Sequence, residues 1–155
     1  SAVTGQRLYA ATLPANFLAY WDGDLTRELL DGNRVAKANT NYTTRPATMG
    51  STDLLVAAGA TAVNGTKATP VLAADLLGDW REEIIWRLGD SAVRLYTTTV
   101  PTRHKVRTLM HDPQYRVQVA AQNTGYNQPP HPSFHLDPAT ALPARRTDID
   151  VARRG

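Results

Sequence analysis

The chain has 155 residues, of which 42% are hydrophobic and 20% are charged, and its formal net charge is +3. This composition is typical of a globular protein with a sizeable core, and it excludes a disordered chain. No apolar run reaches the roughly 18 residues of a membrane span, so no membrane-spanning segment is expected. Cysteine is absent, which excludes disulfides and cysteine-based zinc sites.

The positive charge is concentrated near the C-terminus, at Arg145, Arg146, Arg153 and Arg154. Without these residues the chain is close to neutral, so the charge indicates no nucleic-acid partner. The first residues, 1–5, have neither a basic start nor an apolar stretch, and they do not resemble a signal peptide.

Short apolar blocks, rich in β-branched and aromatic residues and bounded by Gly, Asp, Asn or Pro, follow one another along the chain. They predict strands at residues 17–21, 28–31, 54–58, 71–75, 83–87, 93–98, 105–109 and 116–121. Residues 89–91 (Gly-Asp-Ser) predict a hairpin turn, and a helical turn is expected only within residues 109–115. The sequence therefore predicts an all-β fold of short antiparallel strands over residues 1–136, followed by a linker or disordered tail at 137–155.

The chain also contains an internal repeat. Residues 23–30 align without gaps on residues 78–85, and the two segments share a Gly, an Asp, a Glu and two aliphatic residues. A four-stranded propeller blade takes roughly 40–50 residues, so this offset suits one blade with a longer loop.

The repeated segments are rich in carboxylates that lie close together around a glycine. Asp75, Asp79 and Glu83 form the fuller set, and Asp22 and Asp24 with Glu28 form the poorer one. Calcium prefers six to eight oxygen ligands gathered by a sharp turn, so both loops are candidate calcium sites. The alternative is a solvated acidic hairpin whose carboxylates pair with neighbouring arginines.

Two polar loops are candidate sugar-binding segments. Asn64 and Gly65 predict a turn, and Thr66 and Lys67 add a hydroxyl and an ammonium that suit an anionic sugar. The second loop, residues 121–131, is rich in amides and aromatic side chains. The alternatives are a plain turn with a surface lysine and a polar loop that satisfies its own backbone.

Six motifs occur in a fixed order: WDGD at 21–24, NGTK at 64–67, LGDWREE at 77–83, RLYTTT at 94–99, LMHDP at 109–113 and YNQPPH at 126–131. Together they resemble the C-terminal part of the family 11 polysaccharide lyases, the rhamnogalacturonan lyases. The resemblance implies the C-terminal blades of an eight-bladed β-propeller built from four-stranded antiparallel sheets. It also implies a secreted, extracellular, calcium-dependent enzyme that cleaves rhamnogalacturonan I, an acidic pectic polysaccharide, by β-elimination.

The resemblance implies that Lys67 and Tyr126 are catalytic and that Asn64, Gly65, Thr66 and Asn127 bind the substrate. β-Elimination requires a base that removes the C5 proton of galacturonate and a cation or donor that neutralises its carboxylate. Lys67 suits either role, and the sequence leaves the two open.

Residues 36–46 match no motif of the family. A chain with so few blades does not close a ring, so the remaining blades or a partner chain are expected, and the chain alone is expected to be inactive. The alternative functions are a non-catalytic carbohydrate-binding module and a calcium-binding structural propeller.

Overall fold

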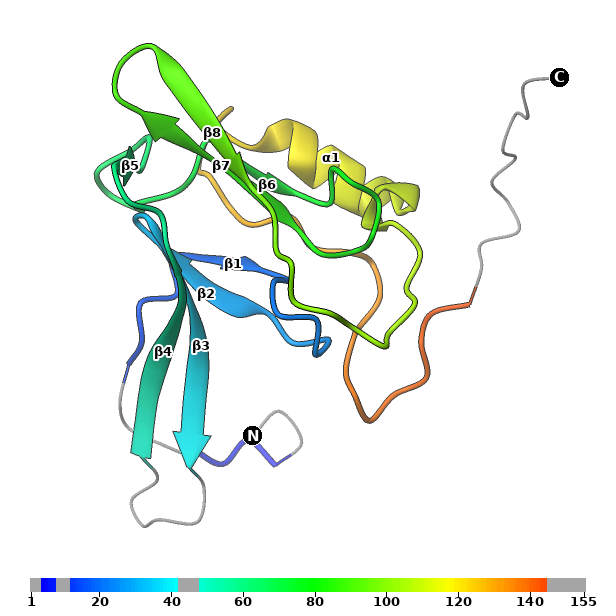
Figure 1. Cartoon of the computed structure of the whole chain (residues 1–155). Coiled ribbons are helices and arrows are strands. Elements are labelled where there is room, and N and C mark those ends of the chain that lie inside the picture. The colour runs from blue at the N-terminus through cyan, green and yellow to red at the C-terminus, as the bar shows by residue number, and fades with distance from the viewer. Residues whose placement is uncertain (1–3, 8–11, 42–47, 145–155) are drawn as a thin grey trace, which may run out of the picture.

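The computed structural model describes residues 4–7, 12–41 and 48–144 (Figure 1). In these ranges the strands are β1 (Phe17–Ala19), β2 (Glu28–Asp31), β3 (Arg34–Asn41), β4 (Thr48–Val56), β5 (Ala60–Thr61), β6 (Leu72–Ala74), β7 (Glu83–Leu88) and β8 (Ala92–Tyr96). A 3-10 turn, η1 (Leu109–His111), and one helix, α1 (Pro113–Ala121), follow them. The predominantly β character expected from the sequence is confirmed. No helix in these ranges is long and apolar enough to cross a membrane.

The first sheet is a four-stranded antiparallel meander in the order β1-β2-β3-β4. β3 pairs with β2 only at its start, up to Ala36, whereas its pairing with β4 continues to Asn41. β3 and β4 therefore extend past β2 as a two-stranded ribbon (Figure 1). This ribbon was missed by the sequence analysis, in which the stretch at 36–46 had no assignment. Residues 42–47 lie outside the described residues.

The second sheet is built around β7, which pairs antiparallel with β5, β6 and β8. β8 takes one edge of β7, and Leu88 and Ile84 on the other edge pair with Ala60 of β5 and Ala73 of β6. β5 and β6 thus follow one another along the same edge, because a strand has only two edges. The predicted hairpin turn at 89–91 is confirmed between β7 and β8.

The core lies between the two sheets. Its buried members come from both of them: Phe17, Ala19, Trp21, Leu30, Val35, Ala57, Ala60, Ala73, Ile84 and Trp86. Trp86 also donates its indole N–H to the carbonyl of Gly32 at 2.8 Å, which ties β7 to the turn after β2. Burying these side chains removes large apolar surfaces from water, and this burial is the main force that holds the sheets together.

Two predicted strands were wrong. Residues 105–109 form no strand and lead into η1, and residues 116–121 belong to α1. The alternation of Val117 and Val119 with polar residues mimics a half-exposed strand, but Asp112 and Pro113 start a helix there. The Asp112 carboxylate accepts hydrogen bonds from two backbone N–H groups of the first turn, and proline is favoured at the first helical position.

α1 is attached to the second sheet by the residue that ends it. Gln122 accepts a hydrogen bond from the N–H of Ala73 at 2.9 Å and donates to the Ala73 carbonyl at 2.8 Å. Its amide therefore satisfies the edge of β6 as a further strand would. α1 lies beside β6 (Figure 1), and Tyr115, Leu109 and Leu136 form a second buried cluster with Tyr20, Leu25 and Trp80.

Replacing Asp112 with alanine is expected to lower the free energy of unfolding by about 2 kcal/mol, the upper end of measured N-cap losses. Its carboxylate also accepts two hydrogen bonds from Ser133, so one side chain holds both α1 and the segment after residue 131. Burial would raise the pKa of Asp112, but the hydrogen bonds from Ser133 and the helix N–H groups outweigh it and lower that pKa.

The stabilisation by Asp112 should therefore be complete above about pH 4 and should disappear as the pH falls through the lowered folded-state pKa. Urea titrations at several pH values measure both effects. A loss that is the same at every acidic pH would contradict the assignment of the stabilisation to the ionised carboxylate.

Candidate functional site

Lys67 and Tyr126, the two predicted catalytic residues, lie in contact although they come from loops far apart in the sequence. The Lys67 ammonium stands 4.3 Å from the centroid of the Tyr126 ring, over its face. Tyr126 is 79% exposed, so its other face and its hydroxyl are open to solvent. The ammonium is attracted to the aromatic face, and the two groups together could bind the carboxylate and the ring of an anionic sugar. Their catalytic role stays a prediction.

The two loops are joined through a single buried hydroxyl. Asn64 accepts a hydrogen bond from the N–H of Lys67 at 2.9 Å and donates from its amide to the hydroxyl of Thr69. Asn127 donates to the same hydroxyl at 3.1 Å, and to the side chain of Asn123 at 3.0 Å. The side chains of Asn64 and Asn127 therefore fix the positions of the two loops that contain Lys67 and Tyr126 relative to each other.

The predicted substrate-binding residues divide into two groups by exposure. Gly65 and Thr66 are exposed at the tip of the turn, where a ligand can reach them. Asn127 is buried, and its side-chain oxygen has no hydrogen-bond partner. Direct contact with substrate stays a prediction for all four residues, of which Asn64 is half-buried, and the structure gives Asn127 a supporting position.

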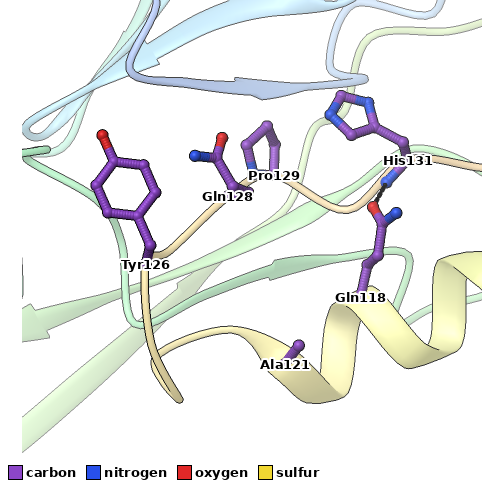
Figure 2. A pocket seen from close by; sticks show the side chains of 6 residues that line it. All are labelled: Gln118, Ala121, Tyr126, Gln128, Pro129 and His131. Carbon is purple, nitrogen blue, oxygen red and sulfur yellow. Dashed lines mark hydrogen bonds between the residues drawn. The ribbon is translucent and has the colours of Figure 1, made fainter.

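A pocket of about 380 Å³ adjoins Tyr126. Figure 2 shows Gln118 and Ala121 of α1 on one side and Gln128, Pro129 and His131 on the other. His131 is fixed at its backbone, where its N–H donates to the Gln118 side chain at 2.6 Å (Figure 2). Burial and the nearby Arg27 guanidinium lower the pKa of His131, which favours the neutral form of its ring. The pocket thus offers amide and imidazole groups next to the lysine and tyrosine pair.

The most buried charged group of this region, Glu82, was missed by the sequence analysis. Its carboxylate is fully buried and accepts hydrogen bonds from the Arg27 guanidinium at 2.9 Å, the Tyr115 hydroxyl at 2.6 Å and the Tyr20 N–H at 2.8 Å. Arg27 also lies 2.9 Å from the ring nitrogen Nδ1 of His131. Glu82 therefore connects the first sheet, α1 and the wall of the pocket.

The internal repeat contained a signal for this pair. Arg27 and Glu82 occupy equivalent positions of the two segments, with opposite charges. The segments themselves have the same backbone conformation: Gly23 and Leu25 have positive φ values of 84° and 73°, and Gly78 and Trp80 have values of 79° and 70°. A β-carbon on Gly23 would lie 2.8 Å from the Thr102 side chain, so glycine is required there.

The predicted calcium ligands Asp75, Asp79 and Glu83 do not assemble. The Asp75 carboxylate accepts hydrogen bonds from the backbone of Gly78 and Leu109 and from the hydroxyl of Thr108. Glu83 accepts two from backbone N–H groups, and Asp79 pairs with Arg81. Burial raises the pKa of Asp75 and Glu83. Each carboxylate is thus used by the loop itself, in partial agreement with the alternative of arginine-paired side chains.

In the first loop the carboxylates do converge. Asp22, Asp24 and Glu28 bring oxygens within 4.8 Å of one another, the only such group of three or more among the described residues, and this spacing could hold a metal ion. The ammonium of Lys37 lies among them, 2.9 Å from Asp22, 2.5 Å from Asp24 and 2.9 Å from Glu28. With that ammonium in place, the trio does not fit a calcium ion.

The paired antiparallel sheets, with the half-buried Lys67 and the exposed Tyr126 on polar loops, define a β-sheet protein with a candidate polar site. The family model described as "Rhamnogalacturonan lyase family 11, C-terminal domain" matches residues 1–145. The chain belongs to this family of enzymes, as its motifs led us to expect.

Individual relatives of the chain are also named rhamnogalacturonan lyases. The chain is 58% identical over 122 residues to the rhamnogalacturonan endolyase YesW of Bacillus subtilis, covering 78% of this chain and 19% of that protein. It is 51% identical over 134 residues to the exolyase YesX of the same organism, covering 84% and 22%. The crystal structure of YesW superposes with a TM-score of 0.75 at 56% identity, covering 83% of this chain and 21% of that one. The chain thus spans about a fifth of the length of these relatives.

Proposed function

We propose that this chain forms part of a rhamnogalacturonan lyase that cleaves the rhamnogalacturonan I backbone by β-elimination at galacturonate. The observation that carries the proposal is the contact between Lys67 and Tyr126 on two exposed loops. It places an ammonium, an aromatic face and a phenol next to a polar pocket. Membership of the lyase family supports the same reading.

β-Elimination at galacturonate divides the work between two groups. One neutralises the carboxylate, which makes the neighbouring C5 proton removable, and the other takes that proton. The C4–O bond then breaks, a C4=C5 double bond forms, and the departing oxygen takes up a proton. Lys67 neutralises the carboxylate as an ammonium or takes the proton as a free amine, and Tyr126 stands within reach of the complementary role.

The two sheets are proposed to be the C-terminal blades of an eight-bladed propeller. Within the described residues, β1, β4 and β8 each pair on one edge only. Unpaired edges favour association with further strands, which the remaining blades or a partner chain would supply. We expect the chain to be active only in that assembly.

Calcium is expected in such a lyase, where it would add positive charge to help neutralise a substrate carboxylate. Among the described residues, the one trio of converging carboxylates, at residues 22, 24 and 28, is already occupied by Lys37. Since the polysaccharide is too large to enter a cell intact, we expect the enzyme to be secreted and to act outside it.

The proposal is tested with the assembled protein on purified rhamnogalacturonan I, with homogalacturonan as the matched control polymer. The expected result is release of unsaturated galacturonate, measured by absorbance, from the first polymer only. Tight binding without cleavage would overturn the proposal in favour of a carbohydrate-binding module. Neither binding nor cleavage would favour a structural propeller.

A further inference from the structure

Lys37 contacts every carboxylate of the loop at residues 22–28, the first of the two repeated loops. Besides Asp22, Asp24 and Glu28, its ammonium donates to the hydroxyl of Thr26 at 3.0 Å. An ammonium has three N–H donors and accepts no hydrogen bond. The four surrounding oxygens therefore satisfy all of its donors.

Lys37 takes the carboxylate oxygens of the loop that would otherwise be open to calcium. Glu28 uses its second oxygen for the N–H groups of Trp21 and Asp22, and Asp24 uses its second oxygen for the N–H and hydroxyl of Thr26. Asp22 likewise uses one of its two carboxylate oxygens to accept a hydrogen bond from the N–H of Asp24. Three carboxylate oxygens remain, and each is directed at Lys37, so a calcium ion would have to displace the ammonium before carbonyls and waters could complete its six to eight ligands.

We propose that Lys37 is the built-in counter-cation of this loop and takes the place of a calcium ion, so that the fold of the loop is independent of calcium. The pairing of β2 with β3 brings this lysine to the loop. β2 and β3 pair at Leu29 and Ala36, and Glu28 and Lys37 are the next residues of the two strands beyond this pair. Cross-strand neighbours of opposite charge stabilise a sheet.

The second repeated loop provides an internal comparison. Glu83 is equivalent to Glu28, and the residue one step beyond the β7–β8 pairing of Ile84 with Tyr96 is Thr97. The Thr97 hydroxyl donates to Glu83 at 3.0 Å, just as Lys37 donates to Glu28. In this loop Leu77 stands at the position of Asp22. The loop with the extra carboxylate thus has the lysine, whereas in the loop without it a hydroxyl meets Glu83 and Arg81 pairs with Asp79.

The charges of the first loop agree with this arrangement. Partial burial would raise the pKa of Asp24, but hydrogen bonds from Lys37 and Thr26 lower it to about 2. Burial raises the pKa of Glu28 to about 7 despite Lys37. The carboxylates raise the pKa of Lys37 against the effect of its burial. The lysine is therefore charged at neutral pH.

The test compares the 155-residue chain with its Lys37→Met variant and with the double variant Asp22→Leu/Lys37→Thr, which matches the second loop at these two positions. Thermal unfolding is followed with calcium and with chelator. The wild-type midpoint is expected not to change. The Lys37→Met midpoint should fall, and calcium at ~100 times its Kd should raise it again by about 5–10 °C. The double variant should be insensitive to calcium, and Lys105→Met is the matched surface control.

A second measurement decides the matter even if Lys37→Met does not fold. Terbium bound in this loop would be sensitised by the indole of Trp21. This residue is close to the loop carboxylates, because its backbone N–H donates to Glu28. The wild-type chain is expected to give no more sensitised emission than its Asp24→Asn variant. Emission, or stabilisation by calcium, that is present in the wild type and lost in Asp24→Asn would overturn the proposal.

Discussion

Replacing Lys67 with methionine is expected to reduce kcat/KM of the assembled lyase on rhamnogalacturonan I by about 10²- to 10⁴-fold, the range typical of a lost acid or base. Methionine keeps much of the length of the side chain and its contact with the Tyr126 ring, but it has neither charge nor a basic nitrogen. Initial rates of unsaturated product formation measure the effect. Lys105→Met, at an exposed lysine away from the site, is the control and should retain full activity.

The alternatives for Lys67 are separated by Lys67→Arg. A guanidinium stays charged at all accessible pH values, so it neutralises a carboxylate but does not remove a proton. Partial activity in this variant, combined with severe loss in Tyr126→Phe, would identify Lys67 as the neutraliser and Tyr126 as the base. Equal loss in the Lys67 arginine and methionine variants would identify Lys67 as the base. Unchanged activity in Lys67→Met would contradict any catalytic role.

The second large effect is expected at Glu82, where substitution with glutamine should lower the free energy of unfolding by about 3–5 kcal/mol. The carboxylate is fully buried, and its partner Arg27 has a side chain that is only 11% exposed. Removing the negative charge leaves a buried guanidinium without a counter-ion and weakens the hydrogen bond from Tyr115. Urea denaturation followed by tryptophan fluorescence measures the loss.

The matched control is Asp53→Asn, which removes the carboxylate of an exposed pair with Arg34. Exposed ion pairs contribute at most about 1 kcal/mol, so its loss should be small. The double variant Arg27→Met/Glu82→Leu should recover part of the stability, because it removes both buried charges together. A loss at Glu82 no larger than that at Asp53 would show that the buried network contributes little.

Much of the fold could be predicted from the sequence, because a strand with one buried face has a local signal. The blocks at 83–87 and 93–98 and the turn between them correspond to β7 and β8. The repeat at 23–30 and 78–85 was also real, since glycines at positive φ and the following Asp and Glu impose the same turn twice. The errors arose where local periodicity was ambiguous, as at 116–121, where the Asp-Pro start of a helix outweighed two alternating valines.

By itself, the sequence determined the family and the antiparallel β architecture, because both depend on residue types at short spacing. Through the resemblance to that family it also predicted a catalytic role for Lys67 and Tyr126. Only the tertiary structure decided which charges meet. It joined Lys67 to Tyr126 through Thr69, paired Arg27 with Glu82, and placed the Lys37 ammonium among carboxylates that had been expected to bind calcium. The physical reason is that a buried carboxylate must be satisfied by whichever donor the packing brings to it, and strand pairing, not sequence spacing, chooses that donor.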